Sequence, residues 1–152
     1  MTQIARVTPT ITVGAYSQND VLGGLLTFKV PGTAGGGLLN RIAIVDDGAV
    51  DNVGKLHIFD DLPATIADNA AISGLATANL HDLLTVVTVV AGDWVTVDAD
   101  KSRAEKSFDY VNYDAPRGNL YGYYELTAAA PTDPTGAAEV TFILHFLPRE
   151  VY

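Results

Sequence analysis

Three histidines are the side chains best suited to bind a metal or transfer a proton. His57 and His145 each lie between two large apolar residues, so both are expected in the middle of strands. His81 is distant from both, and no pair has the short spacing of a zinc site. We predict histidines that face solvent or an interface, and a metal-binding or acid–base role is the alternative.

An acidic segment is the next candidate, because Asp46, Asp47 and Asp51 lie within six residues of one another. Their carboxylates are hard oxygen ligands of the kind that calcium takes, but the closing Glu of an EF-hand loop is missing. Shorter acidic pairs occur at Asp60–Asp61 and Asp98–Asp100. Since Asp bonds readily to the backbone of its own turn, we predict that these residues end strands. Calcium binding is the alternative.

Signatures of nucleophilic or phosphate chemistry are missing from the sequence. The chain has no cysteine and no Gly-x-Ser-x-Gly motif. The run Gly32–Gly37 is rich in glycine but lacks the Gly-Lys-Thr/Ser ending of a P-loop. A glycosidase needs two facing carboxylates, and no acidic residue is flanked by a substrate-stacking tryptophan, since Trp94 is the only one. We expect no catalytic residue, no metal and no cofactor, and therefore a protein that is not an enzyme.

Tyrosines are concentrated in one region, with five of the chain's seven between Tyr110 and Tyr124. Alternation along a strand places Tyr121, Tyr123 and Glu125 on one face and apolar residues on the other. Tyrosine suits interfaces because its ring is apolar and its tip is polar. A ladder of aromatic side chains on a half-buried sheet face fits the pattern equally well.

The last strand has the same character, because both of its faces are apolar. One face is predicted to be core, and the other carries Ile143, His145 and Leu147. Such a strand needs burial on both sides, either by a second layer of the same chain or by a partner chain. We predict that five residues make contacts outside the monomer core, and burial within the chain is the alternative: Tyr121, Tyr123, Ile143, His145 and Leu147.

The elements that position these residues are predicted to be strands. Turn residues recur every 8 to 15 positions between runs rich in β-branched residues, which is typical of an antiparallel sandwich or barrel. Asp68–Leu84 is the exception, where interrupted helical spacing predicts one short helix. A single domain over residues 1–152 is expected, with a possible extended tail at 148–152. Nine strands are predicted, at residues 3–13, 21–30, 38–45, 55–59, 85–90, 93–98, 106–113, 120–127 and 139–147.

Composition limits the possible partners of the chain. Its 152 residues carry a net charge of −9, which argues against binding to nucleic acid or to an anionic membrane. The N-terminal residues lack the pattern of a secretory signal. The longest apolar run, Val86–Ala91, is far shorter than the roughly 20 residues of a membrane-spanning helix. Synthesis in a cytoplasm is therefore expected, with no nucleic-acid or membrane partner.

Several segments together resemble a known group of proteins. Tyr16–Phe28, the strand at 38–45, Leu56–Ala64 and Asp68–Ala71 are similar to small virion structural proteins of tailed bacteriophages, over roughly residues 1 to 147. The resemblance implies a β-sandwich, often jelly-roll-like, that forms a trimer or another symmetric oligomer on the capsid. It carries no catalytic residues.

The resemblance leads to a functional hypothesis. It implies a capsid decoration protein in the virion, made in the host cytoplasm, whose partners are the major capsid protein and other copies of itself. A module that binds glycans or attaches to a host through the tyrosine face is the alternative. An enzyme is the least supported reading, because no catalytic constellation is present.

Overall fold

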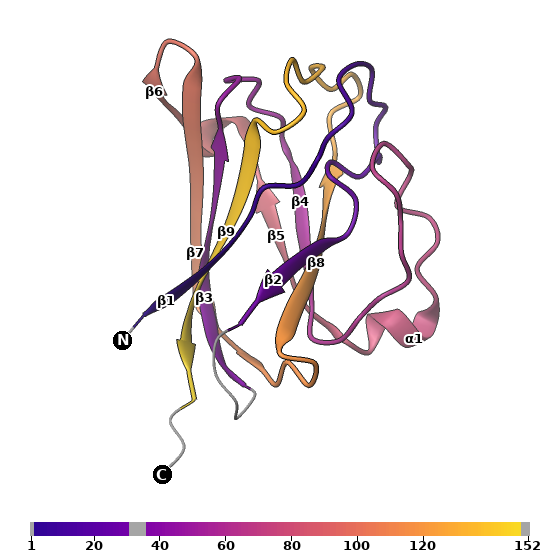
Figure 1. The fold of residues 1–152 in the computed structure, drawn as a ribbon, viewed down its shortest axis with the longest axis vertical. Helices are drawn as coiled ribbons and strands as arrows, with labels where there is room; N and C mark the ends of the chain where they lie inside the picture. The colour runs from indigo at the N-terminus through magenta and orange to yellow at the C-terminus, as the bar shows by residue number, and fades with distance from the viewer. Residues whose placement is uncertain (1, 31–35, 150–152) are drawn as a thin grey trace.

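The computed structural model describes residues 2–30 and 36–149, and in them two antiparallel sheets face each other (Figure 1). One short helix, α1 (Thr77–Leu80), confirms the helix expected within 68–84, and a 3-10 turn, η1 (Ala91–Asp93), precedes the sixth strand. The strands are β1 (Gln3–Val7), β2 (Leu26–Lys29), β3 (Gly37–Asp46), β4 (Gly54–Phe59), β5 (Leu83–Val89), β6 (Trp94–Asp98), β7 (Lys101–Tyr113), β8 (Asn119–Leu126) and β9 (Val140–Pro148).

The order of the strands identifies the topology. One sheet has the order β1-β9-β3-β7-β6 and the other β2-β8-β4-β5. With β6 set aside, the first strand pairs with the last, the second with the second last, the third with the third last, and the two middle strands with each other. This nested pairing of eight strands in two sheets is the jelly roll. The predicted all-β, jelly-roll-like sandwich is confirmed, and β6 is an addition to it.

The main core fills the space between the sheets. Alternate residues of β8 and β9 point into it, including Leu120, Tyr124 and Phe142, and all three are at most 1% exposed. The rings of Tyr124 and Phe142 have centroids 5.3 Å apart, and the Tyr124 hydroxyl donates a hydrogen bond to the Asn52 carbonyl at 2.7 Å. A buried tyrosine hydroxyl needs such a partner. The predicted alternation of both strands is therefore confirmed.

Two of the predicted strands are shorter in the structure. The first ends at Val7 instead of continuing to residue 13, since Pro9 has no N–H for a ladder bond. The strand lies at the edge of its sheet, where a proline is tolerated. The second begins at Leu26 instead of residue 21, because Gly23 and Gly24 have φ angles of +87° and +63° and turn the chain before the strand.

One predicted turn is shorter in the structure, and two predictions reach undescribed residues. The strand predicted at 106–113 begins earlier, at Lys101, so the turn after β6 is shorter than the predicted gap at 99–105. Residues 32–35 of the glycine-rich run Gly32–Gly37 and residues 150–152 of the possible tail at 148–152 lie outside the described residues. Pro148 itself ends β9. No helix in the described part of the chain is long and apolar enough to cross a membrane.

Candidate interaction surfaces

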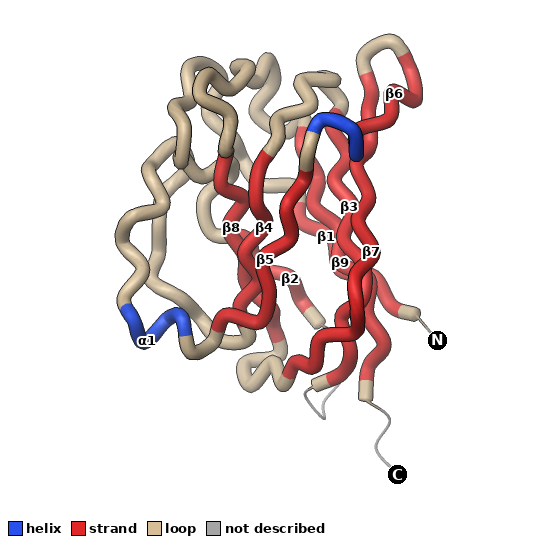
Figure 2. The backbone as a smooth tube through the Cα atoms, turned by 180° about the vertical axis from the view of Figure 1, so that it is seen from behind, coloured by secondary structure: helices blue, strands red, loops and turns tan. Residues whose placement is uncertain are grey.

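The outer face of the four-stranded sheet is covered by the chain itself. The segment 60–82, which includes α1, runs from β4 to β5 and passes over this face (Figure 2). Beneath it lies a second apolar cluster separate from the main core. Its fully buried or nearly buried members are Val21, Phe59, Ile66, Tyr121 and Tyr123.

Tyr121 and Tyr123 are buried because the segment 60–82 covers them. The Tyr123 side chain is 0% exposed, its hydroxyl donates to the Ala64 carbonyl, and the same oxygen accepts the Ile66 N–H at 3.0 Å. Its ring packs edge-on against Phe59, with centroids 6.1 Å apart. The prediction that these tyrosines make contacts outside the monomer is corrected: the covering segment of the same chain buries them. They are also unavailable to stack on a glycan.

Asp68 fixes the covering segment to the N-terminal part of the chain. Its Oδ2 accepts the backbone N–H and the hydroxyl of Thr12, both at 2.6 Å. Its Oδ1 accepts the Tyr16 hydroxyl at 2.7 Å and the Gly23 N–H at 2.6 Å. Burial opposes ionisation, but the bonds from Thr12, Tyr16 and Gly23 prevail and lower the pKa of Asp68. One carboxylate thus joins three separate stretches of chain.

The outer face of the five-stranded sheet has no such cover. No other described segment lies on its outer side in Figure 1. Ile143, His145 and Leu147 of β9 lie on this face, as predicted. Ile143 and His145 are nevertheless only 7% and 6% exposed, because longer side chains from β1, β3 and β7 surround them. Their contact with another chain stays a prediction.

Three arginines gather around His145 on this open face. Arg41 donates from Nη2 to His145 Nδ1 at 2.9 Å, and its Nη1 lies 3.1 Å from Oε1 of Glu105. Arg103 Nη2 contacts the other Glu105 oxygen at 3.0 Å. Arg6 lies directly across from Ile143 in the β1–β9 ladder and is exposed. We call Arg6, Arg41, Arg103, Ile4, Ile143 and His145 the arginine face.

His145 is held neutral by this environment. Arginine can only donate, so Nδ1 of the imidazole accepts and the ring proton lies on Nε2, which is buried without a hydrogen-bond partner. Burial, followed by the positive charge of Arg41, lowers the pKa of His145. The histidines were predicted to face solvent or an interface; for His145 the first is corrected, because its neighbours' side chains bury it, and the second stays a prediction. His57 bonds to Glu125 at 2.9 Å, and His81 is exposed.

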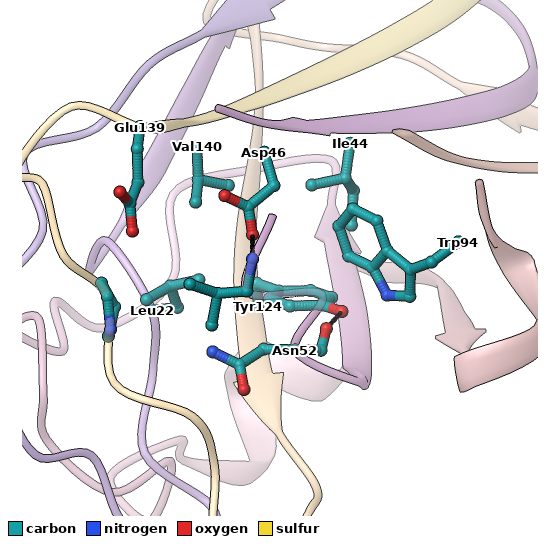
Figure 3. Close-up of a pocket in the computed structure, with 10 residues that line it drawn as sticks. Leu22, Ile44, Asp46, Asn52, Trp94, Tyr124, Glu139 and Val140 are labelled. Atoms are coloured by element: carbon teal, nitrogen blue, oxygen red, sulfur yellow. Dashed lines mark hydrogen bonds between the residues drawn. The ribbon is translucent and has the colours of Figure 1, made fainter. Parts of the chain in front are cut away.

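The acidic turn at 46–52 ends a strand, as predicted, and Asp46 bonds to the backbone of its own turn. Asp46 accepts the backbone N–H groups of Gly48, Val50 and Asp51 at 2.9–3.1 Å, and burial raises its pKa despite these bonds. It borders a pocket at one end of the sandwich, which Trp94, Tyr124 and Glu139 also line (Figure 3).

The second pocket carboxylate is also engaged within the chain. Glu139 accepts the N–H and the hydroxyl of Thr135 at 2.9 and 3.0 Å. Both acids of the pocket therefore stabilise loops. Among the described residues, no three His, Asp or Glu side chains converge as a metal-binding group.

Two functional features were missed by sequence reasoning. Asp68 was placed at the start of a helical segment, and nothing local indicated that it would bond to residues 12–23. The arginine face draws Arg6, Arg41 and Arg103 from three strands whose pairing only the fold reveals. A usable signal did exist for these arginines, since each occupies an alternate position of a predicted strand or lies just before one.

Comparison with known proteins adds little to this picture. No family model matches the chain, and no curated protein matches it. Among solved structures, the chain is similar to one titled "Unassembled KI Polyomavirus VP1 Pentamer", at 14% identity and a TM-score of 0.26, over 99% of this chain and 75% of that one. It is also similar to "Structure of a family two carbohydrate esterase from Cellvibrio japonicus", at 10% identity and a TM-score of 0.17, over 99% of this chain and 37% of that one. Neither superposition is close enough to bear on function, and the fold assignment rests on the strand order.

Proposed function

We propose that this chain is a non-enzymatic structural protein of a tailed-phage virion, where it decorates and stabilises the capsid surface. It acts by binding the major capsid protein and further copies of itself in a symmetric arrangement, with a trimer favoured. The sequence resemblance over residues 1–147 first suggests this role.

The observation that carries the proposal is the open arginine face on a jelly-roll sandwich. Ile4, which is 40% exposed, offers apolar area on this face, and the arginines beside it offer directed hydrogen bonds. Arginine is enriched in protein interfaces for this reason. Many weak copies of such a contact on one shell bind tightly together through avidity. The carboxylates of Asp46 and Glu139 at the end pocket are used within the fold, which leaves this face as the best candidate for function.

Binding to empty capsids tests the proposal. Purified protein is mixed with empty capsids of the phage that encodes it, and the capsids are sedimented. We expect saturable co-sedimentation with a fixed number of copies per capsid, and a higher melting temperature of the capsid. Absence of capsid binding, together with binding to immobilised glycans, would instead favour the attachment module.

A further inference from the structure

The added strand β6 and its turn form a projection with no partner in the described chain. β6 is an edge strand of the five-stranded sheet, and the β6–β7 hairpin stands at an upper corner of the molecule in Figure 1, away from the second sheet. Val95 and Val97 are 63% and 71% exposed. Adjacent valines on an exposed edge strand favour association with another chain.

The tip of this hairpin is acidic as well as apolar. Asp98 and Asp100 are exposed, and Lys101 lies 3.8 Å from Asp100. The hairpin therefore presents two valines followed by a small excess of negative charge. The arginine face presents the complementary set, namely exposed Ile4 beside Arg6 and Arg41.

The charge distribution favours one geometry of self-association. The three arginines and the Glu105 that pairs with two of them together carry a charge of +2, so the rest of this −9 chain carries −11. Two copies packed with arginine directly against arginine would oppose like charges, which disfavours a two-fold contact centred on the arginines. A contact between the arginine face of one copy and an acidic surface of the next pairs opposite charges. Such a heterologous contact forms a closed ring when the rotation between copies closes.

We propose that the β6–β7 hairpin of one copy docks on the arginine face of the next, and that this head-to-tail contact builds the ring. Val95 and Val97 cover Ile4 and the apolar centre of the face, while Asp98 and Asp100 pair with Arg6 and Arg41. The proposal rests on the self-association included in the proposed function, and it identifies the two surfaces that meet.

Charge-reversed variants of the two surfaces test this contact. The face variant is Arg6→Glu, and the hairpin variant is Asp98→Lys/Asp100→Lys. Light scattering coupled to size exclusion is expected to find a wild-type ring and two monomeric variants. An equimolar mixture of the two variants is expected to form at least a 1:1 dimer, because each variant keeps one intact surface. Combining both changes in one chain is expected to restore the ring.

Controls keep charge effects and folding apart from the contact. Lys29→Glu on β2 makes the same change in net charge as Arg6→Glu on the other sheet, and it is expected to leave the ring intact. Circular dichroism confirms the fold of each variant. Val97→Lys, at a position 71% exposed, gives a second hairpin change that does not depend on the aspartates, and it is also expected to yield monomers. Added salt is expected to weaken wild-type association.

The outcomes that overturn the inference are distinct from those that overturn the proposed function. A wild type that stays monomeric up to ~1 mM, or variants that assemble as the wild type does, overturns the hairpin contact. A mixture that yields no dimer does the same. If capsids are bound while these tests fail, the decoration role stands without this contact. If the ring forms but capsids are not bound, the decoration role fails and the contact stands.

Discussion

The two outer sheet faces of the sandwich carry apolar residues at alternate strand positions, and they differ in what covers them. Over the four-stranded sheet, 23 residues between β4 and β5 supply Ile66 and Tyr123's hydrogen-bond partners. Over the five-stranded sheet, no connection of this length passes among the described residues, and Ile143 has Arg6 and Ala43 directly across from it in the neighbouring strands. Apolar residues at the outward positions of a strand therefore indicate that this face is buried. Whether the same chain buries it depends on the length of the connections between its strands.

Replacing Tyr123 by alanine is expected to have the largest effect, because it empties a site buried within one chain. Loss of a large buried aromatic side chain costs about 3–5 kcal/mol. Urea unfolding followed by circular dichroism measures this loss. Tyr110→Ala, at a position 59% exposed, is the matched control and is expected to change stability by less than about 0.5 kcal/mol. If the Tyr123→Ala chain were as stable as the wild type, the covering segment would not bury this tyrosine.

Asp68→Asn is expected to loosen the covering segment with a smaller effect, about 2 kcal/mol, because the amide nitrogen cannot accept the two Thr12 bonds. The lowered pKa of Asp68 also gives a pH dependence. The stabilisation is fully present above the ordinary pKa of about 4 and is lost as pH falls through the lower folded value. Hydrogen exchange of residues 60–82 measures the loosening, and exposed Asp133→Asn is the control. Equal exchange in both variants would show that Asp68 does not hold the cover.

Ile143→Asp sharpens the comparison from the other side. We expect a folded chain that is destabilised by about 1–2 kcal/mol, because the new carboxylate, although at a position only 7% exposed, lies directly across from Arg6 and can pair with it. Self-association should nevertheless be lost. Tyr121→Asp on the covered face makes the same kind of change and should unfold the chain, because it leaves a charge buried without a partner. Light scattering with circular dichroism separates the two results, and unfolding by both variants would remove the distinction between the faces.

The smallest expected effect is the pH dependence that His145 contributes. Since its folded pKa is lowered, the unfolded chain binds a proton more readily. Its contribution to stability is therefore present above the ordinary histidine pKa of about 6.5 and decreases as pH falls below that value. Denaturant unfolding between pH 5 and 8 should show a slope that His145→Gln reduces and that exposed His81→Gln leaves in place. A slope that survives in His145→Gln would assign it to another group.

Much of the architecture followed from local chemistry. Alternation in β8 and β9 separated core residues such as Tyr124 and Phe142 from outward residues such as Tyr123 and His145, because successive strand residues point to opposite faces. Asp46 was identified as a turn residue since a short carboxylate readily bonds to the N–H groups that follow it. The errors fell at strand ends, where Gly23 and the turn before Lys101 decided the boundary.

The tertiary structure decided which outward residues meet solvent. Alternation along a strand determines that the side chains of Tyr123 and Ile143 point away from the core. It does not determine which segments of the chain pack against them. Tyr123 is covered by a segment that Asp68 holds to Thr12, 56 positions away. Ile143 has no such segment over it among the described residues, and it lies directly across from Arg6, 137 positions away. Both outcomes depend on pairing between distant strands, and that pairing is set by packing of the whole sandwich rather than by any local run of residues.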